Sequence, residues 1–307
     1  LWDLSANDCL YAGDEAAQRV GRHPRHWSFI RPIRRGLLAD FDAAEKLCRQ
    51  LFASSKTRKS QVLLAAPPLA GDVELQVLAE VVREAGASSV CLVPSSACLA
   101  YATGLPILES AGLAVVDLGH ALSQASVYSR GSAVLHLQED CGGQELTQRL
   151  REHFRRRHWL AVGETELARV VGTLHCVTQQ SSQEDEWIEV CGQDLQSGLP
   201  RRLTVANWEL NRLLELSLQP LQRMLSRMVE DLPPEILHQI LQQGVFLAGG
   251  LSQLHGLAGY LEQHLALPVR ILPQAELAVS LGLQGFLQQS QLLQVLLASA
   301  AGAGRFA

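Results

Sequence analysis

Two histidines flank a run of arginines near the middle of the chain. His153 and His158 are five residues apart, on either side of Arg155–Arg157. On an α-helix this spacing does not place both imidazoles on one face, and no cysteine lies at a spacing typical of zinc ligands. We therefore expect no metal site here, and we interpret the arginine run as a solvated helix face.

Nucleophile chemistry has equally little support in the sequence. Ser95, Ser96 and His120 could suggest a nucleophile and a base, but no GxSxG elbow and no orienting acid accompany them. The seven cysteines form no CxxC pair, and several lie in apolar runs such as Val90–Val93. This pattern is typical of buried thiols in a reducing compartment rather than of a disulfide framework.

The composition is that of a globular protein and excludes several classes of function. The 307 residues are 47% hydrophobic and 19% charged, with a formal net charge of -5. An acidic chain of this kind lacks the positive field that gathers nucleic-acid phosphates, so we expect no nucleic-acid partner. The chain begins at Leu1, and neither a signal peptide nor a run of about 18 apolar residues is present. We expect a cytoplasmic protein.

Strand-like and helix-like patterns alternate along the sequence. We predict buried strands over Val62–Ala66 and Val90–Val93, each preceded by a helix. We expect Asp42 to cap the first of these helices and Asp72 to cap the second. A three-strand meander is predicted over 113–137, and a later strand leads through Gly249-Gly250 into a helix. This alternation predicts an α/β fold.

Several sequence blocks, in the same order and at similar spacing, resemble the bacterial MreB family. The segment 29–41, FIRPIRRGLLADF, is similar to the family's IRP(L/M)KDGVIADF, and the resemblance extends from about residue 11 to 287. It continues through the blocks Gly13–Ala16, Val20–Arg22, Glu84–Ala87, Ala102–Pro106, Val115–Gly119, Gly198–Arg201 and Leu232–Glu235.

The resemblance implies an actin-like fold, in which two lobes are each built on an RNase H-like βββαβα core and face each other across a cleft. On this basis we expect lobe I to comprise 1–107 with 283–307, including a reduced insertion, IB, at about 9–36. Lobe II would comprise 108–282, with the IIA core at 108–150 and 213–282 and the IIB insertion at about 151–212.

The resemblance also implies which residues would hold a nucleotide. Asp3 corresponds to the family's first phosphate loop, DLGTANT, and we expect the second strand of that hairpin and the strands after it to be deleted. Asp117 and Gly119 correspond to the second loop, DIGGGT, in which Asp117 would hold Mg²⁺ through water. Gly249 and Gly250 stand where the family has TGGG beside adenine.

The same alignment predicts an eroded site. His120, Ala121 and Leu122 replace two glycines and the threonine, and Leu92–Ser96 replaces the IEEP segment whose glutamate orients water. The family's GExTAExIK helix becomes 163–171 without its Glu/Lys pair. We assign no catalytic residue and expect ATP or ADP with Mg²⁺ to bind weakly or not at all.

For each surviving residue the sequence leaves a plainer explanation open. His120 is better explained as a solvent-exposed turn residue than as a phosphate contact. Asp117 could instead cap its turn, and Gly249-Gly250 could simply form a close strand-to-helix junction.

The function implied by the resemblance is cytoskeletal. We expect a filament subunit or a filament-associated pseudo-ATPase in bacterial cell shape or intracellular organisation, which self-associates or assembles with an MreB-type filament. The alternatives are an ATP-binding switch with weak ATPase activity and a non-polymerising adaptor of the same fold. Three basic residues in the loop 54–60 predict weak peripheral contact with the inner face of the membrane.

Overall fold

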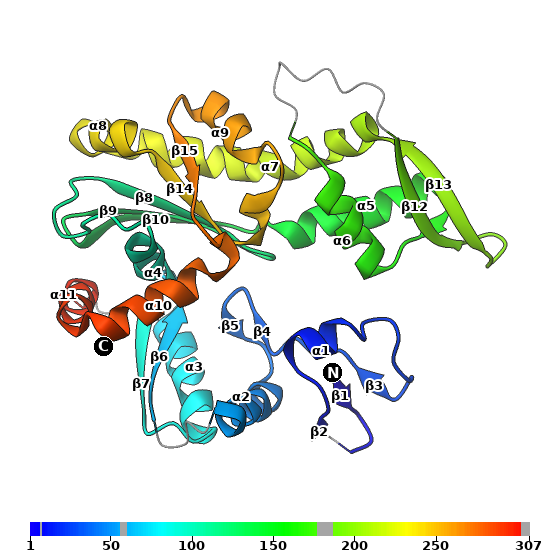
Figure 1. Ribbon diagram of the computed structural model, residues 1–307, viewed down its shortest axis with the longest axis horizontal. Helices are drawn as coiled ribbons and strands as arrows, with labels where there is room; N and C mark the ends of the chain where they lie inside the picture. The colour runs from blue at the N-terminus through cyan, green and yellow to red at the C-terminus, as the bar shows by residue number, and fades with distance from the viewer. Residues whose placement is uncertain (7, 56–59, 177–186, 302–307) are drawn as a thin grey trace. The chain divides into compact units, whose positions relative to one another are not determined.

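The protein folds into two compact units. The computed structural model describes residues 1–6, 8–55, 60–176 and 187–301 (Figure 1). The first unit comprises Leu1–Cys98 with Leu283–Ala307, and the second comprises Leu99–Gly282. Each unit has its own hydrophobic core of buried aliphatic side chains.

The first unit contains three small groups of strands. β1 pairs with β2 on one side and β3 on the other, β4 pairs with β5, and β6 runs parallel to β7. Its elements are β1 (Trp2–Asp3), β2 (Asp8–Cys9), α1 (Gly13–Ala17), β3 (Trp27–Ser28), β4 (Ile33–Arg34), β5 (Leu37–Leu38), α2 (Phe41–Ser55), β6 (Gln61–Ala66), α3 (Asp72–Glu84), β7 (Ser89–Pro94) and α11 (Ser290–Ala301). Along the sequence, α4 (Ser95–Ala102) and α10 (Ala278–Gln288) cross the boundaries between the units.

The predicted strands of this unit are present, but the predicted helix caps are wrong by one or two residues. Helix α2 begins at Phe41, and the Asp40 carboxylate, not that of Asp42, accepts the Ala43 amide at 3.0 Å. Asp72 is already the first helical residue of α3, and the Gly71 amide donates to Glu74 Oε2 at 2.8 Å. In both cases the side chain that completes the first turn is displaced from the predicted cap.

The second unit is built on a five-stranded sheet of order β10-β9-β8-β14-β15. The predicted meander is confirmed as β8 (Leu113–Leu118), β9 (Ser123–Ser129) and β10 (Ser132–Glu139), which pair antiparallel. β14 (Val245–Ala248) lies between β8 and β15 (Val269–Ile271), parallel to both. Helices α7 (Asn207–Glu230), α8 (Pro234–Gln243) and α9 (Leu257–Leu265) pack along this sheet (Figure 1).

A second, three-stranded sheet of the same unit lies near the start of α7. β12 (Trp187–Asp194) pairs with β11 (Leu160–Ala161) and β13 (Pro200–Ala206). α5 (Gly143–His158) packs against both α6 (Glu164–Thr173) and α7. Leu146, Leu150 and Phe154 form the buried face of α5. Helix α7 is 24 residues long and contains Pro220 in its interior.

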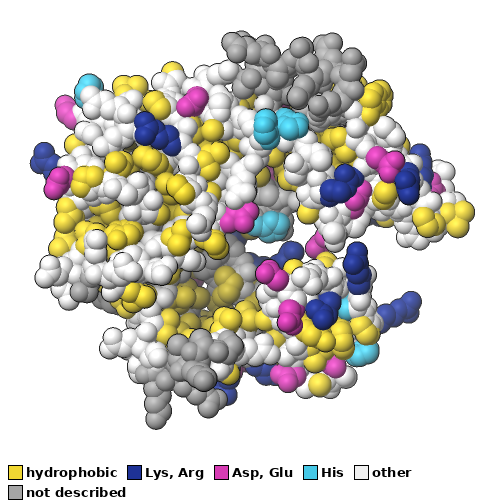
Figure 2. All heavy atoms as spheres, in the orientation of Figure 1, with side chains coloured by type: hydrophobic (Ala, Val, Ile, Leu, Met, Phe, Trp, Pro, Cys, Tyr) yellow, Lys and Arg dark blue, Asp and Glu magenta, His cyan; other side chains and the backbone are white. Residues whose placement is uncertain are grey.

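Charged side chains are mixed over the visible surface. Figure 2 shows acidic and basic side chains interspersed on the described part of that face. Neighbouring opposite charges pair within elements, as in Glu145–Arg149 at 2.7 Å and Glu166–Arg169 at 2.8 Å. Exposed pairs of this kind contribute at most about 1 kcal/mol each. These pairs balance the local charge, and burial of the apolar cores supplies most of the stability of the fold.

Candidate functional site

Asp117 and Gly249 meet at the ends of two parallel strands. β8 and β14 are in register so that Ala248 lies opposite Asp117, which brings Gly249 beside the carboxylate. The carboxyl ends of parallel strands are the usual place for ligands in α/β sheets. The structure therefore brings together three of the predicted residues, Asp117, Gly249 and Gly250, at one edge of the second unit.

The Asp117 side chain is partly buried, and its carboxylate has no hydrogen bond from any described residue. Burial alone raises its pKa to about 6. The carboxylate therefore does not cap the turn that follows it, which contradicts the plainer of our two explanations. A buried carboxylate without a donor is destabilised in its ionised form, and a nearby cation would relieve that cost.

The two glycines beside Asp117 are constrained very differently. Gly249 has a φ of +84°, and a Cβ placed on it would collide with the Leu118 carbonyl and lie 2.7 Å from Asp117 Oδ1. A Cβ on Gly250 would lie no closer than 4.0 Å to its neighbours, the Cγ and Oε1 atoms of Glu276. Close packing explains Gly249 completely, whereas nothing within this unit requires glycine at position 250.

The turn after Asp117 is held by hydrogen bonds within the protein. The Gly119 amide donates to the Leu122 carbonyl at 3.0 Å, and the Ser123 hydroxyl donates to the Cys141 carbonyl at 2.8 Å. His120 lies at the tip of the turn and is exposed, as predicted. The amide of Gly119 and the hydroxyl of Ser123, two donors that a phosphate would need, are thus already used inside the protein.

The carbonyl groups of the same turn cap helix α5. Gly143 N donates to Gly119 O at 3.3 Å, and Gln144 N donates to His120 O at 2.6 Å. A Cβ on Gly142 would lie 2.6 Å from both carbonyl oxygens, so only glycine permits this approach. The positive end of α5, which could otherwise attract an anion, therefore faces carbonyl oxygen atoms.

Asp3 belongs to the first unit, and its carboxylate accepts hydrogen bonds from the turn that follows it. Its Oδ1 atom accepts the Ser5 hydroxyl at 2.6 Å and the Ser5 amide at 2.8 Å. These bonds, the hydroxyl first, lower the pKa of this carboxyl group. The expected loss of the second hairpin strand is wrong, because Asp8–Cys9 pairs antiparallel with Trp2–Asp3. Both strands are only two residues long, which is why the pattern escapes sequence inspection.

Two acidic residues, Glu276 and Glu166, have roles that the sequence analysis did not predict. Glu276 follows β15 in a short 3₁₀ helix, η2 (Ala275–Leu277), and approaches Gly250. The Gly249 amide donates to Ala275 O at 2.9 Å, so this segment is tied to the site. In α6, Glu166 binds the Arg169 guanidinium and accepts the Cys191 amide at 2.8 Å. Glu166 therefore stabilises the contact of α6 with β12.

The two histidines flanking the arginine run do come together, contrary to our expectation. The ring centroids of His153 and His158 are 5.4 Å apart, and both imidazoles face Glu209 of α7. His158 is the last residue of α5, and Trp159 follows it with a left-handed φ of 53°. Burial, as the main cause, lowers the pKa of His153. Sequence spacing could not reveal this because the partner, Glu209, lies on another helix.

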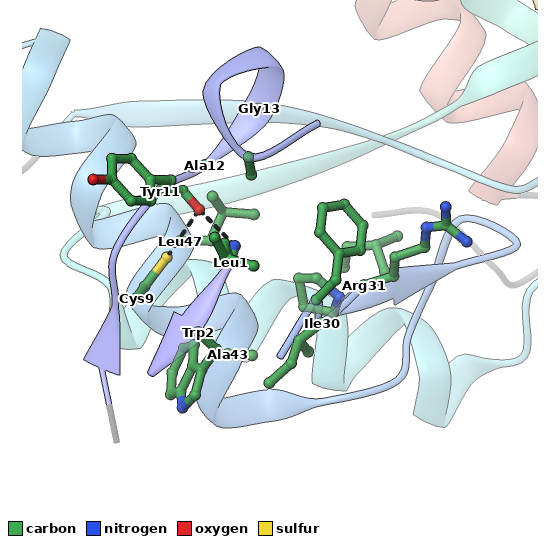
Figure 3. A pocket seen from close by; sticks show the side chains of 14 residues that line it. Leu1, Trp2, Cys9, Tyr11, Ala12, Gly13, Ile30, Arg31, Ala43 and Leu47 are labelled. Carbon is green, nitrogen blue, oxygen red and sulfur yellow. Dashed lines mark hydrogen bonds between the residues drawn. The ribbon is translucent and has the colours of Figure 1, made fainter. Parts of the chain in front are cut away.

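The first unit contains an apolar cavity that the sequence did not predict (Figure 3). Its volume is about 280 Å³, and its lining includes Leu1, Trp2, Tyr11, Phe29 and Leu47, with Arg31 as the one charged side chain among the described residues. The Leu1 amino group donates to Tyr11 O at 2.7 Å at its edge. Asp3 does not line it. The cavity therefore differs in place and in chemistry from the predicted phosphate site.

The surroundings of Asp117 include one oxygen ligand suited to a hard cation. The partly buried carboxylate of Asp117 is the kind of oxygen ligand that Mg²⁺ binds through water. The Gly119 amide of the turn 119–122 and three carbonyls of the turn, those of Gly119, His120 and Leu122, are engaged internally, so this amide is not free to bind a phosphate oxygen. We derive no hydrolytic step from this arrangement.

Comparison with solved structures identifies the fold. The chain resembles MreB5 of Spiroplasma citri bound to ADP, with a TM-score of 0.88 and 22% identity over 94% of this chain and 88% of that one. It also resembles the MamK double helical filament, with a TM-score of 0.68 and 17% identity over 85% and 80% of the two chains. The fold is therefore the actin-like fold.

Sequence comparison narrows the class to a family. The family model described as MreB/Mbl protein matches residues 3–295. The cell shape-determining protein MreB of Escherichia coli (strain K12) is 31% identical over 268 residues, which cover 84% of this chain and 75% of that protein. The cell shape-determining protein Mbl of Bacillus cereus is 28% identical over 91% and 85% of the two chains. The chain belongs to the MreB/Mbl family of actin-like cytoskeletal proteins.

The structure also bears on membrane contact. Among the described residues, no helix combines the length and the apolar character needed to cross a bilayer. The basic residues of the predicted peripheral contact, Lys56, Arg58 and Lys59, lie outside the described part of the chain.

Proposed function

We propose that this protein is an MreB-type filament subunit or filament partner whose nucleotide site turns over ATP poorly or not at all. It acts in the cytoplasm in bacterial cell shape or intracellular organisation, through self-association or assembly with an MreB-type filament. The observation that carries the loss of turnover is the closed turn 119–122, whose Gly119 amide bonds to Leu122 O and whose carbonyls cap α5. The actin-like fold and the family membership support the filament role.

The proposal extends to the nucleotide. Two structures similar to this chain are of MreB5 bound to ADP and to AMPPNP. In this chain Asp117 retains a carboxylate for a hydrated Mg²⁺, whereas the turn beside it lacks the glycines that would turn amides toward phosphate. We therefore propose weak binding of ATP or ADP with Mg²⁺, and weak attachment to the inner face of the membrane through the basic loop 54–60.

One observation favours a second candidate function, an ATP-binding switch with weak hydrolysis. Asp117 is partly buried and has no hydrogen-bond donor in the described part of the chain, as expected of a carboxylate that serves a cation. Calorimetric titration with Mg-ATP separates the two functions. Tight binding with phosphate release would favour the switch and contradict the pseudo-ATPase.

Pelleting assays test the filament role directly. We expect the purified protein to sediment alone or together with Escherichia coli MreB at high protein concentration, with no need for ATP hydrolysis. A protein that stays monomeric in the supernatant in both assays would instead be a non-polymerising adaptor.

Restoring the turn is expected to restore nucleotide affinity. A variant carrying His120→Gly, Ala121→Gly and Leu122→Thr should bind Mg-ATP at least tenfold more tightly, because one additional amide bond to a charged oxygen contributes about 1.5–3 kcal/mol. Calorimetry measures the change. The single variant His120→Ala removes the imidazole without adding glycine, and its affinity should equal that of the wild type. A restored turn that binds no better would refute our explanation of the erosion.

A further inference from the structure

A cluster of three possible metal ligands, to which no role has been assigned, lies between α5 and α7 and does not include Asp117. His153 Nε2 is 3.1 Å from Glu209 Oε1, and His158 Nε2 is 3.7 Å from the same oxygen. The three candidate ligand atoms all lie within 4.8 Å of one another. This is the one such group of three or more ligating side chains in the described part of the chain.

These three atoms are buried, and their contacts with one another are poorly aligned for hydrogen bonds. His153 Nε2, His158 Nε2 and Glu209 Oε1 are each buried with no partner in hydrogen-bonding geometry among the described residues. The side chains are only 13%, 18% and 16% exposed. Buried polar atoms normally have well-aligned partners. Here the three convergent atoms have only ion pairs with one another and with Arg157, an arrangement that suits a central cation.

The two distances from the imidazole nitrogens to the carboxylate oxygen agree with tetrahedral coordination. Zinc binds imidazole nitrogen and carboxylate oxygen at about 2.0–2.1 Å, which places neighbouring ligands of a tetrahedron about 3.3 Å apart. The two nitrogen-to-oxygen distances, 3.1 and 3.7 Å, lie on either side of that value. Two imidazoles and one carboxylate form a ligand set known for zinc, with the fourth position open to water.

The two helices supply a suitable electrostatic setting. His158 is the last residue of α5, whose carboxyl end favours a cation, and Glu209 lies in the first turn of α7, whose amino end favours an anion. One side chain competes with a metal: Arg157 Nε lies 2.7 Å from Glu209 Oε1. Because the Arg157 side chain is 65% exposed, it can turn into solvent when a metal arrives.

We propose that His153, His158 and Glu209 form a binding site for a divalent transition-metal ion, with zinc as the preferred ion, joining the end of α5 to the start of α7. Imidazole ligands favour zinc over magnesium, which prefers oxygen ligands and keeps its waters. The site is separate from Asp117 and does not depend on the proposed filament function.

Zinc titration of the chelator-treated chain tests the proposal. We expect calorimetry to detect one zinc ion per chain at this site, with affinity unchanged by a large excess of Mg²⁺. His153→Gln, His158→Gln and Glu209→Gln should each lower the affinity more than 100-fold, because loss of even an outer-shell partner costs about 10–100-fold. Cobalt should give the visible spectrum of a tetrahedral nitrogen and oxygen site, without a thiolate band.

A gain-of-affinity variant and two matched controls make the test independent of folding defects. Arg157→Gln removes the competing charge and should tighten zinc binding. Glu152→Gln alters an exposed carboxylate on the same helix, and His255→Gln alters the other close histidine pair, His175–His255, whose ring centroids are 4.6 Å apart. Both controls should bind zinc as the wild type does.

Three outcomes would overturn the site. These are a wild-type chain that binds no zinc, ligand variants that keep wild-type affinity, and a His255→Gln variant that loses the ion. Circular dichroism of each metal-free variant verifies that it is folded before the titration is interpreted.

Discussion

An Asp117→Asn variant should be more stable than the wild type at about pH 8, by on the order of 3 kcal/mol. The reason is that burial raises the pKa of Asp117 from 3.8 to about 6. Each pKa unit corresponds to about 1.4 kcal/mol of differential stability between the two protonation states. Asparagine keeps the shape of the side chain and cannot ionise.

The pH dependence gives the sign of this effect. Between pH 3.8 and about 6 the folded protein retains the Asp117 proton, while the unfolded chain has released it. The free energy of unfolding therefore falls as pH rises through this window, and the full cost is present above it. We expect the stability difference between variant and wild type to shrink toward zero below about pH 4.

Urea denaturation at several pH values measures this difference. Glu109→Gln, which neutralises an exposed carboxylate in the same unit, serves as the matched control and should have little effect. Added Mg²⁺ should stabilise the wild type more than Asp117→Asn if the carboxylate serves a cation. A variant no more stable than the wild type at high pH would mean that Asp117 has a partner that lowers the cost of its charge.

Gly249→Ala should destabilise the second unit by more than about 3 kcal/mol. The positive φ of +84° costs a residue with a Cβ about 1–2 kcal/mol. The added methyl group would also collide with the Leu118 carbonyl and lie 2.7 Å from Asp117 Oδ1. These are atoms of the central strand β8, which cannot move without disturbing its pairing with β14.

The neighbouring glycine provides the control. A Cβ on Gly250 meets only Glu276 atoms, at 4.0 Å, so Gly250→Ala should change the free energy of unfolding by less than about 1 kcal/mol. Thermal or urea unfolding of the two variants compares them directly. Equal losses of unfolding free energy in the two variants would show that the contact of Gly249 with Leu118 and Asp117 is not what requires glycine there.

The strands and the fold family were predictable from sequence because both depend on patterns that continue over many residues. Val62–Ala66 became β6, and the meander over 113–137 became β8, β9 and β10. The parallel pairing of β8 with β14, which joins Asp117 to Gly249, could be expected only through the resemblance to MreB, since no local pattern links residues so far apart. The domain boundaries that we derived from the resemblance remain predictions.

What the sequence missed depends on single hydrogen bonds and on contacts between distant segments. Asp40 rather than Asp42 caps α2 because the helix begins two residues earlier than the periodicity indicated. The closure of the turn 119–122 depends on carbonyl directions that residue types do not specify. The meeting of His153 and His158 involves Glu209, which lies on another helix.

The proline inside α7 has a mechanical consequence. A 24-residue helix is about 36 Å long, and it joins the part of the unit around Glu209 to the five-stranded sheet. Pro220 cannot donate the backbone hydrogen bond that would hold the preceding turn, so bending stiffness is lowest there. We therefore expect a force applied at one end of α7 to bend the helix at Pro220 before it displaces the other end.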